Sequence, residues 1–201
     1  MSRIVRWEIC GGIASGKTTL AQLLAQNGFI AEYENFEANP FWESFYKDPI
    51  GAAFETEITF FLQHYHGIKV AQKELLPVVH DHSLLLDLAY ARVTLRGRRL
   101  DIFESIFLEI WNELQTPRLL VYLKCGPSIE LSRIRKRARK VEQAIDLQYM
   151  SVLNETLDAV VKEFGQDIRI HEIDSASINF VDDSATQFMI VSELLTKLDV
   201  Q

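Results

Sequence analysis

Residues 11–18 read Gly-Gly-Ile-Ala-Ser-Gly-Lys-Thr and match the phosphate-binding loop pattern G-x-x-x-x-G-K-[ST] in full. An apolar run over 4–10 comes directly before this loop, and an apolar helical pattern over 17–27 follows it. Loops of this kind surround a phosphate with inward-pointing backbone N–H groups, and the N-terminus of the next helix favours anions. The order strand, loop, helix therefore predicts an α/β fold that binds a nucleoside triphosphate.

Two side chains of the loop carry specific chemistry. The Lys17 ammonium can reach the outer phosphates, and the Thr18 hydroxyl can hold a magnesium ion. We expect the triphosphate to be bound by the loop and the residue after it, namely Gly11, Gly12, Ile13, Ala14, Ser15, Gly16, Lys17, Thr18 and Thr19.

Short apolar runs alternate with helical patterns along the rest of the chain. The predicted strands are 4–10, 29–33, 76–81, 118–124 and 168–173. The predicted helices are 17–27, 40–47, 51–73, 84–95, 100–114, 127–139, 146–164 and 183–198. Short apolar strands are typical of a parallel sheet covered by helices on both faces. This pattern predicts a three-layer α/β sandwich whose ligand lies at the carboxyl ends of the strands.

The length and charge of the chain limit its partners and its location. Its 201 residues suit one domain spanning 1–201, and no linker or repeat divides them. The net charge of −7 disfavours nucleic-acid binding. No apolar stretch is long enough to span a bilayer, and the N-terminus lacks a signal-peptide core. We therefore expect a cytoplasmic protein with neither nucleic-acid nor membrane partners.

Two acidic residues lie at the carboxyl ends of predicted strands. Glu34 could take a proton from an attacking hydroxyl or hold the metal, although a solvated loop acid is an equal alternative. Asp81 closes the apolar run Leu75–Asp81, and an acid in that position supports magnesium in phosphate-loop proteins. We expect Asp81 to join Thr18 at the metal.

Basic residues gather late in the chain. Six of its 21 lysines and arginines lie between 133 and 140. In that segment Arg133 and Arg137 are four residues apart, so they share a helix face. Such a cluster can be a solvated surface, but in an acidic phosphate-loop protein it favours a lid over the transferring phosphoryl group, at about 133–142.

The span between Arg6 and Arg92 contains no arginine, although it should supply much of the acceptor pocket. A nucleoside monophosphate is a dianion that usually requires an arginine fork. Aromatic residues are frequent in this span instead, which suits a flat base and a sugar. The absence of arginine therefore favours a neutral hydroxyl as the phosphate acceptor.

Several short motifs, in their order and spacing, resemble those of one family. Tyr33–Phe41 resembles a Y-E-P segment, residues 45–49 resemble F-Y-x-D-P, and Phe61–Tyr65 resembles L-Q-x-Y. Residues 133–142 resemble the lid pattern R-I-x-x-R-G-R-x-x-E. With the phosphate-binding loop, the chain is similar to the deoxynucleoside kinases, in particular to the bacterial deoxyadenosine/deoxyguanosine kinase-like branch.

The resemblance implies a P-loop kinase fold, with a five-stranded parallel sheet flanked by helices, and a homodimer packed through helices. It also implies a reaction of nucleotide salvage, in which the γ-phosphate of ATP, with Mg²⁺ as cofactor, moves to the 5′-hydroxyl of a deoxynucleoside. Purines are the favoured bases on this resemblance. The implied residues for the acceptor are the general base Glu34, the sugar ligands Tyr46 and Glu142, the base ligands Gln63 and Asp87, and His82 near the 5′-hydroxyl. The implied residues for the donor are Lys17, Arg133, Arg137 and Arg139 at the phosphates, with Lys17 and Arg137 also catalytic, and Thr18 and Asp81 at Mg²⁺.

The chain departs from the family pattern at three positions. The motif D/E-R-S reads Asp81-His82-Ser83, so histidine replaces the arginine near the 5′-hydroxyl. Asn35 replaces a proline, and Ala138 replaces the lid glycine. Two alternatives therefore stay open from the sequence: another small-metabolite or nucleoside monophosphate kinase, and a nucleotide-binding regulatory protein that has lost catalysis.

Overall fold

A parallel five-stranded sheet forms the centre of the molecule, in a computed structural model that describes residues 5–198. The strand order is β2-β3-β1-β4-β5, and each neighbouring pair is parallel. The strands are β1 (Arg6–Gly11), β2 (Ile30–Glu32), β3 (Val78–His80), β4 (Leu119–Lys124) and β5 (Ile170–Asp174). All five lie within the predicted strands or within one residue of them; Ile4, at the start of the predicted strand 4–10, lies outside the described residues.

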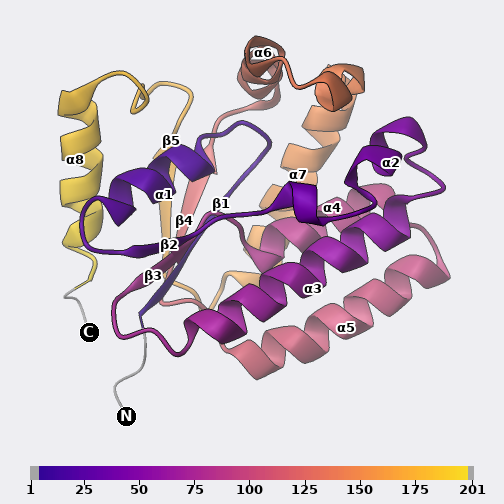
Figure 1. The fold of residues 1–201 in the computed structure, drawn as a ribbon, viewed down its shortest axis with the longest axis horizontal. Coiled ribbons are helices and arrows are strands. Elements are labelled where there is room, and N and C mark those ends of the chain that lie inside the picture. The colour runs from indigo at the N-terminus through magenta and orange to yellow at the C-terminus, as the bar shows by residue number, and fades with distance from the viewer. Residues whose placement is uncertain (1–4, 199–201) are drawn as a thin grey trace.

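Helices cover both faces of the sheet, which confirms the predicted three-layer α/β architecture (Figure 1). The α-helices are α1 (Lys17–Ala25), α2 (Trp42–Lys47), α3 (Ala53–Ala71), α4 (Leu84–Thr94), α5 (Arg98–Leu114), α6 (Pro127–Arg137), α7 (Leu147–Phe164) and α8 (Ser184–Leu195). Two short 3₁₀ helices, η1 (Phe36–Ala38) and η2 (Lys140–Ala144), were not predicted. Among the described residues, no helix has the length and apolar character needed to cross a membrane.

Alternating side chains of the central strands divide the core into two clusters. Trp7 and Ile9 of β1 and Val121 of β4 pack with α1 and α8 in the smaller cluster. Cys10 of β1 and Tyr122 of β4 point to the opposite face and pack with α3, α4, α5 and α7 in the larger cluster. Because successive side chains of a strand point to opposite faces, one apolar strand can serve both cores.

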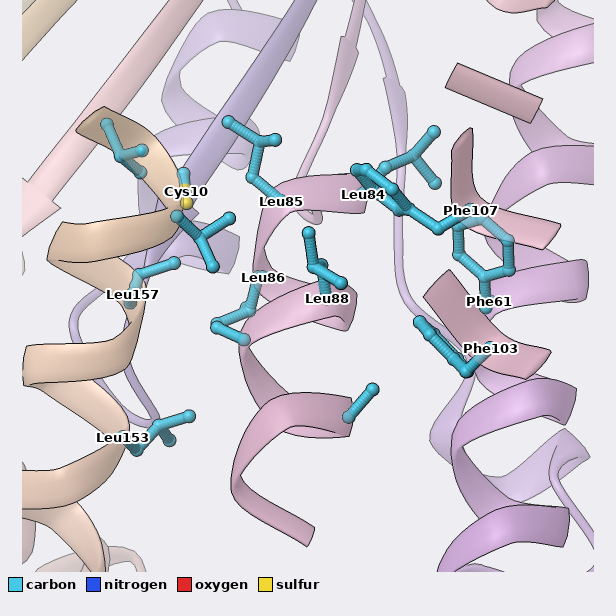
Figure 2. Packing of buried hydrophobic residues seen from close by; sticks show 14 of the residues in the cluster. Cys10, Phe61, Leu84, Leu85, Leu86, Leu88, Phe103, Phe107, Leu153 and Leu157 are labelled. Atoms are coloured by element: carbon cyan, nitrogen blue, oxygen red, sulfur yellow. The ribbon is translucent and has the colours of Figure 1, made fainter. Parts of the chain in front are cut away.

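Helix α4 is buried because other helices surround it. It contacts α3, α5 and α7, and Leu84, Leu85 and Leu88 have no exposed surface. Figure 2 shows these leucines between Leu157 of α7 and the ring of Phe61 of α3 with its aromatic neighbours. The Phe61 ring lies 5.1 Å from that of Phe103 and 5.9 Å from that of Phe107, both on α5. A helix enclosed by three others is apolar over most of its surface, which explains its leucine-rich sequence.

Helix α6 ends two residues before the predicted boundary at 139. Ala138, its C-cap, has φ 55° and ψ 32°, which is the left-handed conformation. The backbone then changes direction into η2, so that the predicted lid segment 133–142 is a helix end followed by a 3₁₀ turn. A left-handed residue after a helix is usually glycine, because a Cβ is sterically unfavourable there. Ala138 is therefore a strained position at the turn of the lid.

We expect Ala138→Gly to stabilise the protein by about 1 kcal/mol, because glycine adopts this conformation without the Cβ penalty. Urea unfolding of the two proteins would measure the difference. Ala159→Gly, at an exposed position inside α7, is the matched control and should lose about 1 kcal/mol. Equal losses in both variants would contradict the strain assigned to Ala138.

Candidate active site

The phosphate-binding loop joins the carboxyl end of β1 to α1, and its own lysine bonds to the loop backbone. The Lys17 Nζ donates hydrogen bonds to the carbonyl oxygens of Gly11 and Gly12, each at 2.9 Å. Gly16 has φ 109°, and a Cβ there would lie 2.7 Å from the Phe180 ring. Glycine is therefore required at position 16 by the backbone conformation and by the packing of Phe180. The Lys17 ammonium lies against the loop backbone.

Asp81 connects three elements at the carboxyl edge of the sheet. Its Oδ2 accepts a hydrogen bond from the Thr18 hydroxyl at 2.8 Å, and its Oδ1 accepts one from the Glu34 backbone N–H at 2.6 Å. Its own backbone N–H donates to the Glu32 carbonyl at 3.0 Å. Thr18 and Asp81, the pair predicted for the metal, are therefore in contact. The backbone of the candidate base Glu34 is hydrogen-bonded to the same Asp81 carboxylate.

A cleft of about 1020 Å³ opens beside the loop. One part of its wall is formed by the loop residues Ile13, Ala14 and Gly16–Thr19, together with Arg133 and Arg137. The rest carries acids, histidines and aromatic rings from α2, α3, α4, η2, α7 and the connections after β2 and β3. These residues are Glu34, Phe36, Trp42, Phe45, Tyr46, Glu57, Phe60, His64, His82, Asp87, Tyr90, Glu142 and Tyr149. The cleft thus joins a cationic part to a part with aromatic and acidic walls, as the arginine-free span predicted.

The structure brings together all but one of the acceptor residues named from the sequence. Gln63 is half-buried and is not among the residues that line the cleft. The cleft-lining residues of α3 share one helix face at spacings of three and four, and they are Thr56, Glu57, Phe60 and His64. Gln63 is rotated about 100° from His64. Sequence reasoning missed Glu57 and His64, and the helical spacing from Phe60 is the signal that could have found them.

The lid residues are paired with each other and with the loop. The Arg133 guanidinium donates to the carbonyl oxygens of Ala14 and Ser15, both at 3.3 Å, and of Ser175 at 2.6 Å. Arg137 donates to both carboxylate oxygens of Glu142, at 2.8 and 2.6 Å. These contacts fasten α6 to the phosphate loop and bring Arg137 and Glu142, predicted for different substrates, into one ion pair.

Arg139 also lines the cleft and pairs with Glu142. Its guanidinium lies 3.4 Å from Glu142 and 4.3 Å from the centre of the Phe36 ring. Glu142 is 3% exposed, and the two arginines compensate the charge of its buried carboxylate.

Burial and neighbouring charges separate the proton affinities of the acids in the cleft. Desolvation raises the pKa of Glu34, although 37% of its side chain is still accessible through the cleft, and the charges of His64 and Lys17 oppose that rise. Burial raises the pKa of Glu57 to about 8, against the hydrogen bond that the Thr94 hydroxyl donates to it at 3.1 Å. Glu57 is therefore mostly a neutral carboxylic acid at pH 7.

Comparison with known proteins agrees with this geometry. The sequence model of the family described as deoxynucleoside kinase matches residues 8–198. Deoxyguanosine kinase of Bacillus subtilis (strain 168) is 28% identical over 179 residues, which cover 85% of this chain and 86% of that protein. Deoxyadenosine kinase of Dictyostelium discoideum is 26% identical over 191 residues, which cover 92% of this chain and 77% of that protein.

A solved structure shares the fold. Deoxyadenosine kinase from M. mycoides with bound dCTP superposes with a TM-score of 0.81 at 22% identity, over 95% of this chain and 98% of that one. The match of the family model over nearly the whole chain, with the loop, the acid after β2 and the lid in one cleft, shows that the chain belongs to the deoxynucleoside kinase family.

Proposed function

We propose that the chain transfers the γ-phosphoryl group of ATP to the 5′-hydroxyl of a deoxynucleoside, with Glu34 as the general base. The observation that carries these roles is the Asp81 carboxylate, which bonds the Thr18 hydroxyl of the phosphate loop and the Glu34 backbone at once. The donor site and the candidate base are thereby held in one cleft. Positioning and charge stabilisation supply most of the catalysis in phosphoryl transfer, so such a fixed arrangement suits the reaction.

The proposed reaction forms a bond between the acceptor oxygen and the γ-phosphorus and breaks the bond from that phosphorus to the bridging oxygen of ADP. The hydroxyl proton passes to the Glu34 carboxylate. Lys17 and Arg137 stabilise the negative charge on the oxygens of the transferred group. Thr18 and Asp81 offer hard oxygen ligands in direct contact, a donor set that fits Mg²⁺, and that ion would neutralise phosphate charge.

Lys17→Ala and Glu34→Gln should each lower kcat by at least about 100-fold. Lys17→Ala removes the stabilisation of the transferred phosphate, and Glu34→Gln removes the proton acceptor. Labelled ATP and a panel of deoxynucleosides would measure the rates, and thermal unfolding would confirm that both variants fold. Glu37→Gln, at an exposed acid that does not line the cleft, is the control and should keep wild-type activity.

Retained turnover in both variants would contradict the assigned roles. ATP binding by the wild-type protein without transfer to any deoxynucleoside would favour a regulatory protein that has lost catalysis.

For the base we propose that Glu57 and Asp87 supply the hydrogen-bonding groups, with Glu57 in the role expected of Gln63. A protonated carboxyl group presents one donor and one acceptor, the same pair that a glutamine amide presents. Relatives that act on deoxyguanosine and deoxyadenosine, by their names, support a preference for purines.

The base contact proposed for Glu57 predicts that the KM for the deoxynucleoside depends on pH. The raised pKa of Glu57 keeps it protonated below about pH 8, and it loses its donor proton as the pH rises through that value. The KM for the deoxynucleoside should therefore rise roughly tenfold between pH 7 and pH 9, because a hydrogen bond to the base is lost. In Glu57→Gln, whose amide does not titrate, this rise should be absent, and steady-state kinetics at several pH values would compare the two. The same rise in both proteins would refute a base contact by Glu57.

We also propose a homodimer that packs through α3 and α5, in the cytoplasm. The two helices lie side by side on one outer face of the molecule (Figure 1). Both carry large apolar side chains that are exposed in the single chain: Leu62, Val70, Ile102 and Leu108. Exposed apolar groups on adjacent helices are typical of an interface between subunits.

Light scattering should give the mass of a dimer, twice 23.1 kDa, for the wild-type protein. Ile102→Glu combined with Leu108→Glu should shift it to a monomer, because two buried charges would lie in the interface. Val152→Glu, at an exposed apolar position on α7, is the control and should remain dimeric. A wild-type monomer would contradict this assembly.

A further inference from the structure

His64 of α3 lies between two acids, Asp87 and Glu34, in the part of the cleft that has aromatic and acidic walls and is proposed to bind the acceptor. Its Nδ1 lies 3.0 and 2.9 Å from the two carboxylate oxygens of Asp87 on α4. Its ring stacks on that of His82, with centroids 3.9 Å apart and an angle of 12° between the planes. Only 6% of the side chain is exposed. The contact with Asp87 fixes the direction in which the His64 ring points, and the stacking on His82 fixes the plane of the ring.

The second ring nitrogen of His64 points toward the candidate base. Its Nε2 lies 3.8 Å from the Glu34 Oε1 and is buried with no hydrogen-bond partner among residues 5–198. Buried polar atoms of proteins are nearly always paired, so an unpaired nitrogen close to a carboxylate indicates a contact completed by a small movement.

The positive charge of the two stacked rings belongs to His64. Burial lowers its pKa, but the charge and hydrogen bond of Asp87, with the charges of Glu34 and Asp81, outweigh that effect and raise the pKa to about 9. Burial and the neighbouring charge of His64 hold the pKa of His82 well below its usual value.

Other charged groups face the two rings from the surrounding elements. Lys17 at the start of α1, Arg6 of β1 and the titratable His80 of β3 act on His82, and Asp81 after β3 acts on His64. Lys17 and His64 are the cations that act on Glu34.

We propose that His64 is a positioning residue for phosphoryl transfer: its imidazolium, held by Asp87, orients the Glu34 carboxylate toward the acceptor hydroxyl. This inference rests on the proposed function of Glu34. The cation lies beside Glu34 from α3, and not at position 82, where the family pattern has arginine and this chain has histidine. In this role Asp87 orients the His64 imidazolium, in addition to the contact with the deoxynucleoside base proposed above.

His64→Gln should lower kcat about 100-fold, because a misplaced reacting group costs that order of rate, while the KM for ATP stays within about twofold. His64→Arg, which keeps a cation beside Glu34 and Asp87, should recover kcat to within about tenfold of wild type. His66→Gln is the matched control, since it makes the same change at an exposed position of α3 outside the cleft, and it should leave kcat and both KM values unchanged.

A folded His64→Gln with kcat within threefold of wild type would overturn the proposal, as would a folded His64→Arg no more active than His64→Gln. If the wild-type protein transfers phosphate to no deoxynucleoside, the proposed function fails before this test begins.

A measurement on the wild-type protein covers the case in which the variants do not fold. At pH 8 an unperturbed imidazole is neutral, so the ¹⁵N shifts of the labelled histidines should reveal one ring with both nitrogens protonated. Five neutral rings at that pH would overturn the proposal.

Discussion

The arrangement of the cleft depends on one carboxylate, that of Asp81. Strands β2, β3 and β1 are parallel neighbours, so their carboxyl ends meet at one edge of the sheet. Asp81 uses its two oxygens for different elements there, the first turn of α1 and the connection after β2. Because it is 3% exposed, water competes little with these bonds. The phosphate loop and the acid of the acceptor part therefore have a fixed relation before any ligand arrives.

The order of elements and the donor part of the site could be predicted from the sequence because their signals are local. The loop motif spans eight residues, and the apolar runs around it identify strand and helix without tertiary information. Asp81 was also predictable, since an acid that closes an apolar strand must lie at the carboxyl edge of a parallel sheet.

The acceptor part was harder to predict because it depends on which face of α3 turns toward the cleft. Gln63 and His64 are adjacent in sequence, yet the helical rotation between them places only His64 on the cleft wall. The left-handed turn at Ala138 was not predicted, since alanine is a strong helix former and the helical pattern continued to 139. The glycine that the family pattern has at this position was the signal that could have indicated it. The charge of His64 depends on Asp87, which lies 23 residues away on another helix.

The pairing of Arg137 with Glu142 has a consequence for how two substrates bind. Each residue is the other's main partner in the ligand-free cleft, although one is proposed for phosphate and the other for sugar. A triphosphate that draws Arg137 away leaves the buried Glu142 with Arg139 alone, and a sugar hydroxyl then becomes a more favourable partner for it. By thermodynamic linkage the acceptor must aid the donor by the same factor. On the roles proposed for Arg137 and Glu142, this ion pair would make the binding of donor and acceptor cooperative without any change in the sheet.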